Sequence, residues 1–93
     1  MVKKTKQNPD LSGSENQKAD KNRFMVLHND DFNSFEYVIE CLVNVCNHDV
    51  TQAEQCAYIT HYKGRCDIKS GKFSELKPMK DNLIEKGLTV VIQ

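Results

Sequence analysis

Apolar residues recur along the chain from position 24 onward, in spacings that predict strands and helices. The first run, 24–28, is short and apolar on both faces, which is typical of a buried strand. A helical repeat follows, with Ser34 or Asn33 as its N-cap and Glu36 near its positive end. Its apolar positions are Phe35, Val38, Ile39, Leu42, Val45 and Cys46. The pattern predicts a strand, a turn and a helix that packs one face on a sheet.

The middle of the chain predicts a second helix and a second strand. Residues 47–49 are polar and break the first helix, and Thr51 and Glu54 form a capping-box pattern that starts the next one. Gly64 is a suitable left-handed stop for that helix. Residues 65–69 then alternate between polar and apolar, as expected of a strand with one solvated face, and a turn follows at 70–71.

The last part of the chain predicts a third helix, entered around 73–77, with Pro78 in its first turn, where a missing N–H costs least. Residues 86–88 end it, with Leu88 placed to touch Leu83 in a Schellman motif. Residues 89–92 form a final strand. The predicted order is β-α-α-β-α-β, an α/β (α+β) fold. We expect a small open sandwich, with three helices packed on one face of a three-stranded antiparallel sheet.

Composition divides the chain into a tail and one domain. Residues 1–22 are rich in Lys, Asn, Asp, Ser and Gln and contain almost nothing that packs, so we expect a disordered N-terminal tail. Residues 23–93 form the folded domain. A chain of 93 residues, 39% of them hydrophobic, is sufficient for one small domain with a modest core.

Charge and hydropathy exclude several classes of function. Lysine and arginine balance aspartate and glutamate, so the formal net charge is zero and a nucleic-acid or anionic-lipid footprint is not expected. No apolar stretch approaches the roughly 20 residues that span a bilayer, and the N-terminal lysines precede no apolar segment of a secretory signal. We expect a cytoplasmic protein that is monomeric on its own and carries no cofactor.

Four cysteines raise the question of disulfides or zinc. They are Cys41, Cys46, Cys56 and Cys66. None forms a C-x-x-C pair, and without a secretion signal the expected compartment is reducing. We therefore interpret them as small buried hydrophobic residues rather than metal ligands.

The polar turn after the first strand is the main candidate for chemistry. Asn29 and Asp30 carry oxygen acceptors, and His61 at the end of the second helix adds a ring nitrogen. Asn and Asp are also favoured turn residues, and a histidine near a helix C-terminus also interacts with free carbonyls. On the residues alone, turn chemistry and ligand binding remain equally open for Asn29 and Asp30, whereas Asp31 suits a structural role near the helix start.

The stretch VLHNDDFNSFEYVIECL, followed by THYKGR, resembles the ClpS family over about residues 24–92. These adaptors deliver N-degron substrate proteins to a Clp AAA+ unfoldase of the ClpA or ClpC type, so the resemblance implies a peptide-binding module and not an enzyme. It implies that Asn29, Asp30 and His61 surround the free α-amino group of the substrate. The apolar pocket for its first side chain falls on Asn33, Phe35, Val38, Ala57 and Thr60, with Cys41 and Leu42 as possible deeper contributors.

The chain departs from the family pattern at several of these positions. Ala57 stands where a gating methionine is common, Ser34-Phe35 replaces a Pro-Met pair, and Thr60 replaces a valine before the histidine. The resemblance also implies an unfoldase-docking surface, which falls on Glu75 and Lys80 if one residue nearby is deleted. An alternative is a regulator that docks on the unfoldase and alters its substrate choice without N-degron binding.

Overall fold

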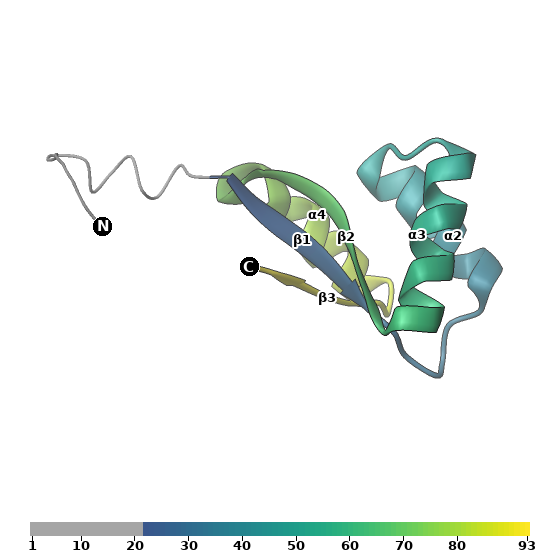
Figure 1. Cartoon of the computed structure of the whole chain (residues 1–93). Helices are drawn as coiled ribbons and strands as arrows, with labels where there is room; N and C mark the ends of the chain where they lie inside the picture. The colour runs from purple at the N-terminus through teal and green to yellow at the C-terminus, as the bar shows by residue number, and fades with distance from the viewer. Residues whose placement is uncertain (1–21) are drawn as a thin grey trace, which may run out of the picture.

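The computed structural model describes residues 22–93, and the tail expected before them lies outside the described residues except for Asn22 (Figure 1). Three strands are present: β1 (Asn22–His28), β2 (Arg65–Lys72) and β3 (Thr89–Ile92). They form an antiparallel sheet in the order β2-β1-β3. The helices are α2 (Phe35–Cys46), α3 (Val50–Lys63) and α4 (Phe73–Glu85). The predicted order β-α-α-β-α-β is confirmed.

The starts of α2 and α3 follow from side-chain caps. Ser34 caps α2, because its hydroxyl accepts a hydrogen bond from the Tyr37 N–H at 3.1 Å, as predicted. The predicted start of α3 at Thr51 is wrong. Asp49 is the N-cap instead, and its carboxylate accepts from the Gln52 N–H at 2.8 Å. Aspartate is a strong capping residue, and it precedes the capping-box pattern by two positions, so the helix begins earlier.

Helix α4 begins at Phe73, the first residue of the range in which its start was predicted, but two details at this end of the helix differ from the prediction. Strand β2 continues through Lys72 instead of turning at 70–71, and α4 follows directly at Phe73. Pro78 therefore lies in the second turn of α4 and not the first. The C-terminal Schellman motif is confirmed, since the Leu88 N–H donates to the Leu83 carbonyl at 3.0 Å and the Gly87 N–H to the Ile84 carbonyl at 2.9 Å.

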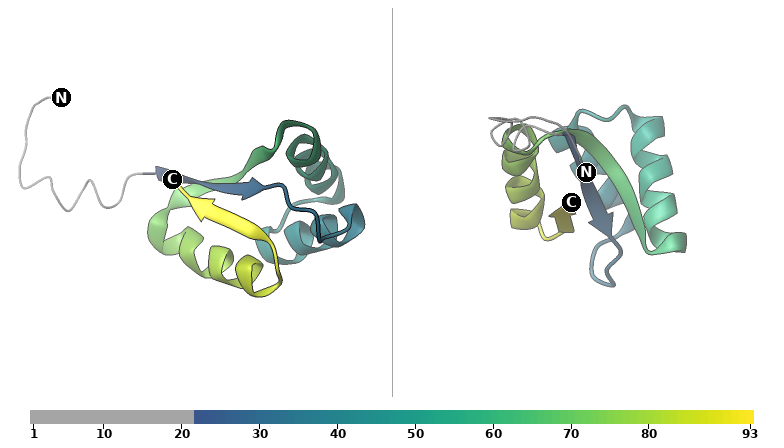
Figure 2. Two further views of the ribbon diagram at one scale, coloured as in Figure 1. Left: turned by 90° about the horizontal axis from the view of Figure 1, so that it is seen from below. Right: turned by 60° about the vertical axis from the view of Figure 1, so that its left-hand side comes forward.

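One connected apolar core joins the sheet to the helices. Its sheet members include Met25, Leu27 and Val90, and its α4 members are Leu76 and Leu83. Helix α4 contacts all three strands, α3 contacts β2, and α2 packs between α3 and α4. Helices α2 and α3 lie together near the C-terminal end of β1 (Figures 1 and 2). This arrangement brings the turn after β1 next to the last turn of α3.

His48 is buried, although it belongs to the polar break at 47–49, where a surface position would be expected. Its side chain is 4% exposed, and Nε2 lies 2.7 Å from the Ile68 carbonyl oxygen. Because a carbonyl only accepts, Nε2 carries the proton in this hydrogen bond. Sequence spacing gave no sign of this contact, since Ile68 lies on β2, across the whole of α3.

No helix in the described part of the chain combines the length and the apolar character needed to cross a membrane.

Candidate functional site

The candidate site is a pocket of about 570 Å³ at the C-terminal end of β1. The turn after β1, the first turns of α2 and the last turns of α3 form its walls. All eight residues expected at the amine and apolar ends line this one pocket. They are Asn29, Asp30, Asn33, Phe35, Val38, Ala57, Thr60 and His61. The fold therefore brings together residues from three separate segments of the chain.

Asp30 organises the turn through both carboxylate oxygens. Oδ1 accepts from the backbone N–H groups of Phe32 and Asn33, each at 2.9 Å, and Oδ2 accepts from the side-chain amide of Asn33 at 2.9 Å. Burial acts to raise the pKa of Asp30, but the hydrogen bonds from Asn33 and Phe32 outweigh it, and the pKa lies below the ordinary 3.8. The carboxylate is therefore ionised at neutral pH.

The hydrogen bonds of Asp30 leave room for one more donor. A carboxylate has about four lone-pair sites, two on each oxygen. Two N–H groups occupy Oδ1, whereas one amide N–H occupies Oδ2. Oδ2 therefore retains capacity for one further donor, and Asp30, which shapes the turn, is also among the residues that line the pocket.

Asn33 connects the turn after β1 to the loop between α4 and β3. Its side-chain amide donates to Asp30 Oδ2 and also to the Gly87 carbonyl between α4 and β3, each at 2.9 Å. Both amide hydrogens are thus committed to the protein. Asn33 lines the pocket, as expected, and it also holds Asp30 in place.

The turn and helix α3 are joined directly. The Asn29 backbone N–H donates to the Gly64 carbonyl at 2.9 Å, at the residue that ends α3. His61 lies one turn earlier on that helix, and its ring packs edge-to-face on Tyr62 with ring centroids 4.9 Å apart. The backbone hydrogen bond explains why Asn29 and His61, far apart in sequence, line the same pocket.

The apolar wall of the pocket comes from α2 and α3. Val38 is half-buried, Ala57 is buried and Phe35 is partly exposed. The Thr60 hydroxyl donates to the Cys56 carbonyl of its own helix at 2.7 Å. Since that polar group is satisfied within the helix, Thr60 behaves toward the pocket much like the valine it replaces.

Sequence reasoning did not identify every residue of the pocket. Tyr58 and Tyr62 line it, although neither was a candidate, and so do Leu27, His28 and Asp31. Helical spacing contained the signal for the tyrosines, because positions 58 and 62 lie beside 57 and 61 on α3. Cys41 and Leu42 are buried in the core and are not among the residues that line the pocket.

The cysteines have the environment expected of buried apolar residues. Cys41, Cys46 and Cys56 are buried and Cys66 is half-buried, and all four are free thiols. Burial raises the pKa of Cys46 to about 11 and that of Cys66 to about 12. Between residues 22 and 93, no three His, Cys, Asp or Glu side chains are grouped so that they could hold a metal ion.

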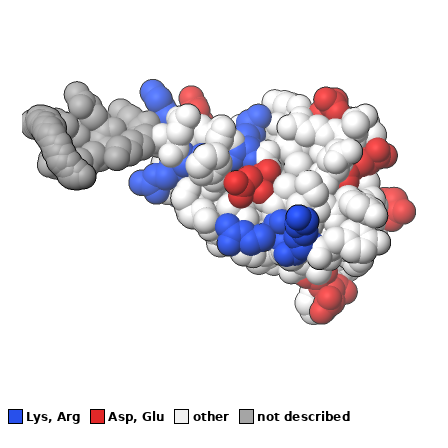
Figure 3. All heavy atoms as spheres, in the orientation of Figure 1, with Lys and Arg blue, Asp and Glu red and all other residues white. Residues whose placement is uncertain are grey.

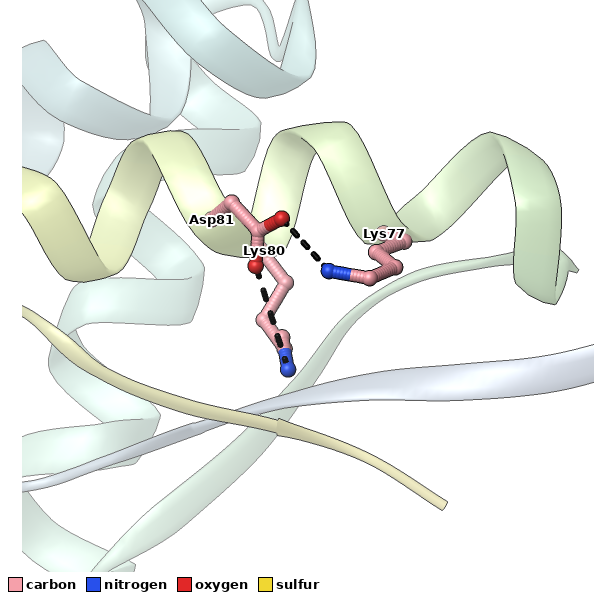
Figure 4. Close-up of polar contacts among 3 residues, drawn as sticks. All are labelled: Lys77, Lys80 and Asp81. Atoms are coloured by element: carbon pink, nitrogen blue, oxygen red, sulfur yellow. Dashed lines mark hydrogen bonds and ion pairs between the residues drawn. The ribbon is translucent and has the colours of Figure 1, made fainter.

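The two candidate docking residues lie on α4, apart from the residues that line the pocket. Glu75 accepts from the Lys72 N–H at 3.3 Å at the start of the helix. The Lys80 ammonium lies 3.9 Å from one carboxylate oxygen of Asp81, whose other oxygen binds Lys77 at 2.7 Å (Figure 4). The hydrogen bond from Lys77 lowers the pKa of Asp81. The Lys77–Asp81 pair is exposed and therefore adds little stability, whereas the Lys80 side chain is partly buried, at 27% exposed.

Comparisons with known proteins agree on one family. The family model for the ATP-dependent Clp protease adaptor protein ClpS matches residues 18–91. The ClpS adapter protein of Pectobacterium carotovorum is 33% identical over 86 residues, covering 81% of each chain. That of Clostridium acetobutylicum is 34% identical over 62 residues, covering 59% of this chain and 61% of the relative.

A solved structure shows the same fold. Agrobacterium tumefaciens ClpS2 bound to L-phenylalaninamide superposes with a TM-score of 0.67 at 20% identity, covering 78% of this chain and 95% of that one. The family model covers nearly all of the residues that the structure describes. The strands and helices of this chain follow the β-α-α-β-α-β order of the ClpS fold. The chain therefore belongs to the ClpS family of ATP-dependent Clp protease adaptor proteins.

Proposed function

We propose that this protein binds substrates with a free, bulky apolar N-terminal residue and delivers them to a Clp AAA+ unfoldase of the ClpA or ClpC type. The observation that carries the proposal is the composition of the pocket. Acceptors from Asn29, Asp30 and His61 line the same cavity as the apolar side chains of Val38 and Ala57. An α-amino group attached to an apolar side chain matches both parts.

The amine end of the pocket suits an ammonium ion. A free α-amino group has a pKa near 8, so it is largely protonated at neutral pH and offers three N–H donors. Asp30 Oδ2 has a free acceptor position, Asn29 has a side-chain carbonyl, and His61 has a ring nitrogen in its neutral form. The negative charge of Asp30 strengthens the hydrogen bond that it makes to the ammonium.

The apolar end suits a large first side chain. Burying a side chain such as Leu or Phe contributes roughly 1.5–3 kcal/mol relative to leaving it in water. L-Phenylalaninamide, which the similar ClpS2 binds, combines a free amine with an aromatic side chain. These are the two features that the pocket of this chain would recognise.

A titration of peptides that differ only in the first residue tests this function. Peptides beginning with free Phe or Leu should bind, and the same peptide beginning with Gly should bind roughly 10-fold or more weakly, since it buries no side chain. Fluorescence anisotropy of a dye at the peptide C-terminus measures each affinity. Equal affinities for Phe and Gly would exclude the pocket as a first-residue site.

Delivery requires a surface other than the pocket, and we propose that Glu75 and Lys80 of α4 contribute to it. Lys80→Ala should slow degradation of a Phe-led reporter by a Clp unfoldase and its protease several-fold while leaving peptide affinity unchanged. Lys80 is the cleaner position, because Glu75 also accepts a hydrogen bond at the start of α4. Normal degradation with Lys80→Ala would place the docking surface elsewhere.

A further inference from the structure

Two side chains join the start of α2 to the C-terminal end of α4. The Asn33 amide donates to the Gly87 carbonyl at 2.9 Å, and the Tyr37 hydroxyl donates to the Lys86 carbonyl at 2.7 Å. Lys86 and Gly87 follow the last residue of α4, where carbonyls have no partner within the helix. Two consecutive carbonyls at this helix end are therefore satisfied by side chains that lie four residues apart in the segment 33–37.

These contacts close a ring of hydrogen bonds. Asn33 precedes Ser34, whose hydroxyl accepts from the Tyr37 N–H at 3.1 Å. The Tyr37 hydroxyl binds Lys86, and the carbonyl of the next residue, Gly87, binds Asn33. Hydrogen bonds in a connected network support one another, so loss of one loosens its neighbours in the ring.

The α4 side of the ring is itself fixed. The N–H groups of Lys86, Gly87 and Leu88 all donate to carbonyls in the last turns of α4, at distances between 2.9 and 3.1 Å. Leu88 is also part of the apolar core, at 4% exposed. The two carbonyls therefore form a rigid anchor against which the segment 33–37 is held.

Asn33 transmits this support to the pocket. Its amide also donates to Asp30 Oδ2 at 2.9 Å, the oxygen that retains capacity for one further donor. The position of that N–H determines which direction of Oδ2 stays open to a ligand. Within the ring, Asn33 lines the pocket, whereas Tyr37, Lys86 and Gly87 are not among its lining residues. Support for the pocket carboxylate thus comes from outside the pocket.

An amine needs a carboxylate that is held in place, because exposed charges alone do not define a position for it. Acidic side chains are scattered over the α2–α3 end of the molecule in the view of Figure 3. Salt screens such charges over about 8 Å at physiological ionic strength, so they attract a cation without orienting it. A hydrogen bond acts only at short distance and within a narrow range of angles. Selective binding of an ammonium therefore depends on how firmly Asp30 is held.

We propose that Tyr37 is a positioning residue for amine binding: its hydroxyl, acting through the loop between α4 and β3 and through Asn33, holds Asp30 in place. The inference rests on the proposed function, since it requires that the pocket bind a free α-amino group. It makes the loop between α4 and β3 a support of the amine end, although this loop does not line the pocket.

Tyr37→Phe tests the proposal, because it keeps the ring and removes only the hydroxyl. It should weaken binding of a Phe-led peptide about 2- to 5-fold, as expected when one neutral hydrogen bond of the network is lost. It should leave binding of the N-acetylated form unchanged, since that form lacks the ammonium. Calorimetric titration measures the free peptide, and NMR chemical-shift titration measures the weaker acetylated one.

A double variant tests whether Tyr37 acts through Asn33. Asn33→Ala should weaken the free peptide about 10-fold, because it removes the hydrogen bond to Asp30 directly. Adding Tyr37→Phe to Asn33→Ala should then cause no further loss, since the link is already broken. His48→Phe is the control. It also removes a hydrogen bond to a backbone carbonyl, that of Ile68, but away from the pocket, so it should leave both peptide affinities unchanged.

The outcomes distinguish the positioning role from the function on which it rests. If Tyr37→Phe lowers the thermal midpoint but binds both peptides as the natural protein does, the ring is only structural and the proposal is wrong. Additive losses in the double variant, or equal weakening of the free and acetylated peptides by Tyr37→Phe, would also overturn it. Each of these results leaves the proposed function intact. If no Phe-led peptide binds the natural protein, the proposed function fails and the positioning role fails with it.

Discussion

At the scale of single residues, Asp30 illustrates how one side chain serves both fold and site. Three hydrogen bonds from Phe32 and Asn33 fix its carboxylate, and the same bonds keep its pKa below the ordinary value. The structural role of Asp30 in the turn is therefore compatible with its proposed role in binding an amine. The polar turn holds the carboxylate in the position where the proposed amine needs an acceptor.

Asp30→Asn should weaken binding of a Phe-led peptide by about 1.5–3 kcal/mol, roughly 10- to 150-fold, because a hydrogen bond to a charged group is lost. The new amide also places a donor opposite the donor of Asn33. Calorimetric titration measures the change. Asp31→Asn is the matched control, since it removes the same charge from an adjacent exposed residue of the pocket. An equal loss in both variants would mean that only net charge matters, and that Asp30 makes no direct contact.

Ala57 controls the width of the apolar end in this account. It is buried on the pocket wall where a methionine is common in the family. With alanine there, first residues branched at Cβ should be tolerated, and we expect only a weak preference for Leu over Ile and Val. Ala57→Met should sharpen that preference by about 1–3 kcal/mol. A panel of Leu-, Ile-, Val- and Phe-led peptides measures it. Strong rejection of Ile by the natural protein, unchanged in Ala57→Met, would make Phe35 the gate instead.

At the scale of elements, a β-bulge and a buried histidine stabilise the connection between the helices and the sheet. In the pairing of β1 with β2, Val26 lies opposite Asp67 and Met25 opposite Lys69, so Ile68 is the extra residue. A bulged residue loses its partner in the ladder. The carbonyl of Ile68 accepts instead from His48, between α2 and α3.

His48→Phe should therefore lower the free energy of unfolding by about 1–3 kcal/mol, since it leaves a buried carbonyl without its donor. In a domain of this size that loss corresponds to a fall in Tm of several degrees or more. Thermal unfolding followed by circular dichroism measures it. His48→Gln retains an N–H donor and should lose less. Equal Tm values for the natural protein and His48→Phe would show that this hydrogen bond contributes nothing.

The elements could be predicted from sequence wherever local chemistry decides them. The Ser34 cap, the Gly64 stop and the Schellman motif at Leu88 depend on neighbours within a few residues.

The start of α3 was not predicted correctly, because two local capping residues competed and Asp49 caps the helix instead of Thr51. The burial of His48 was missed because its partner is distant in sequence. Tyr58 and Tyr62 were not predicted to line the pocket, although their helical spacing beside Ala57 and His61 contained the signal.

At the scale of the whole molecule, a core rich in thiols makes stability sensitive to alkaline pH. The pKa values of Cys46 and Cys66 are raised by burial from 9.0 to about 11 and about 12. In the unfolded chain both thiols ionise nearer 9.0. Between about pH 9 and about pH 11 the folded state therefore binds more protons than the unfolded state, and stability falls as pH rises. Below about pH 9 the full contribution of the thiols is present.

Urea unfolding at about pH 7.5 and about pH 10 should show this loss. Cys46→Val and Cys66→Val, combined, remove the two thiols while keeping the sites apolar, so the loss between the two pH values should become smaller. The natural protein and the double variant share every other ionisable side chain. The thiols would have no role in the pH dependence if the natural protein and the double variant lost the same stability.

We propose that the end of β1, α2 and α3 together recognise a free amine beside an apolar side chain. The most direct measurement compares one Phe-led peptide with its N-acetylated form. Acetylation removes the charge and two donors and leaves buried acceptors unpaired, at about 1–3 kcal/mol each, so affinity should fall by about 100-fold or more. Amidation of the C-terminus of the same peptide should change nothing. Equal binding of the free and acetylated peptides would contradict the account.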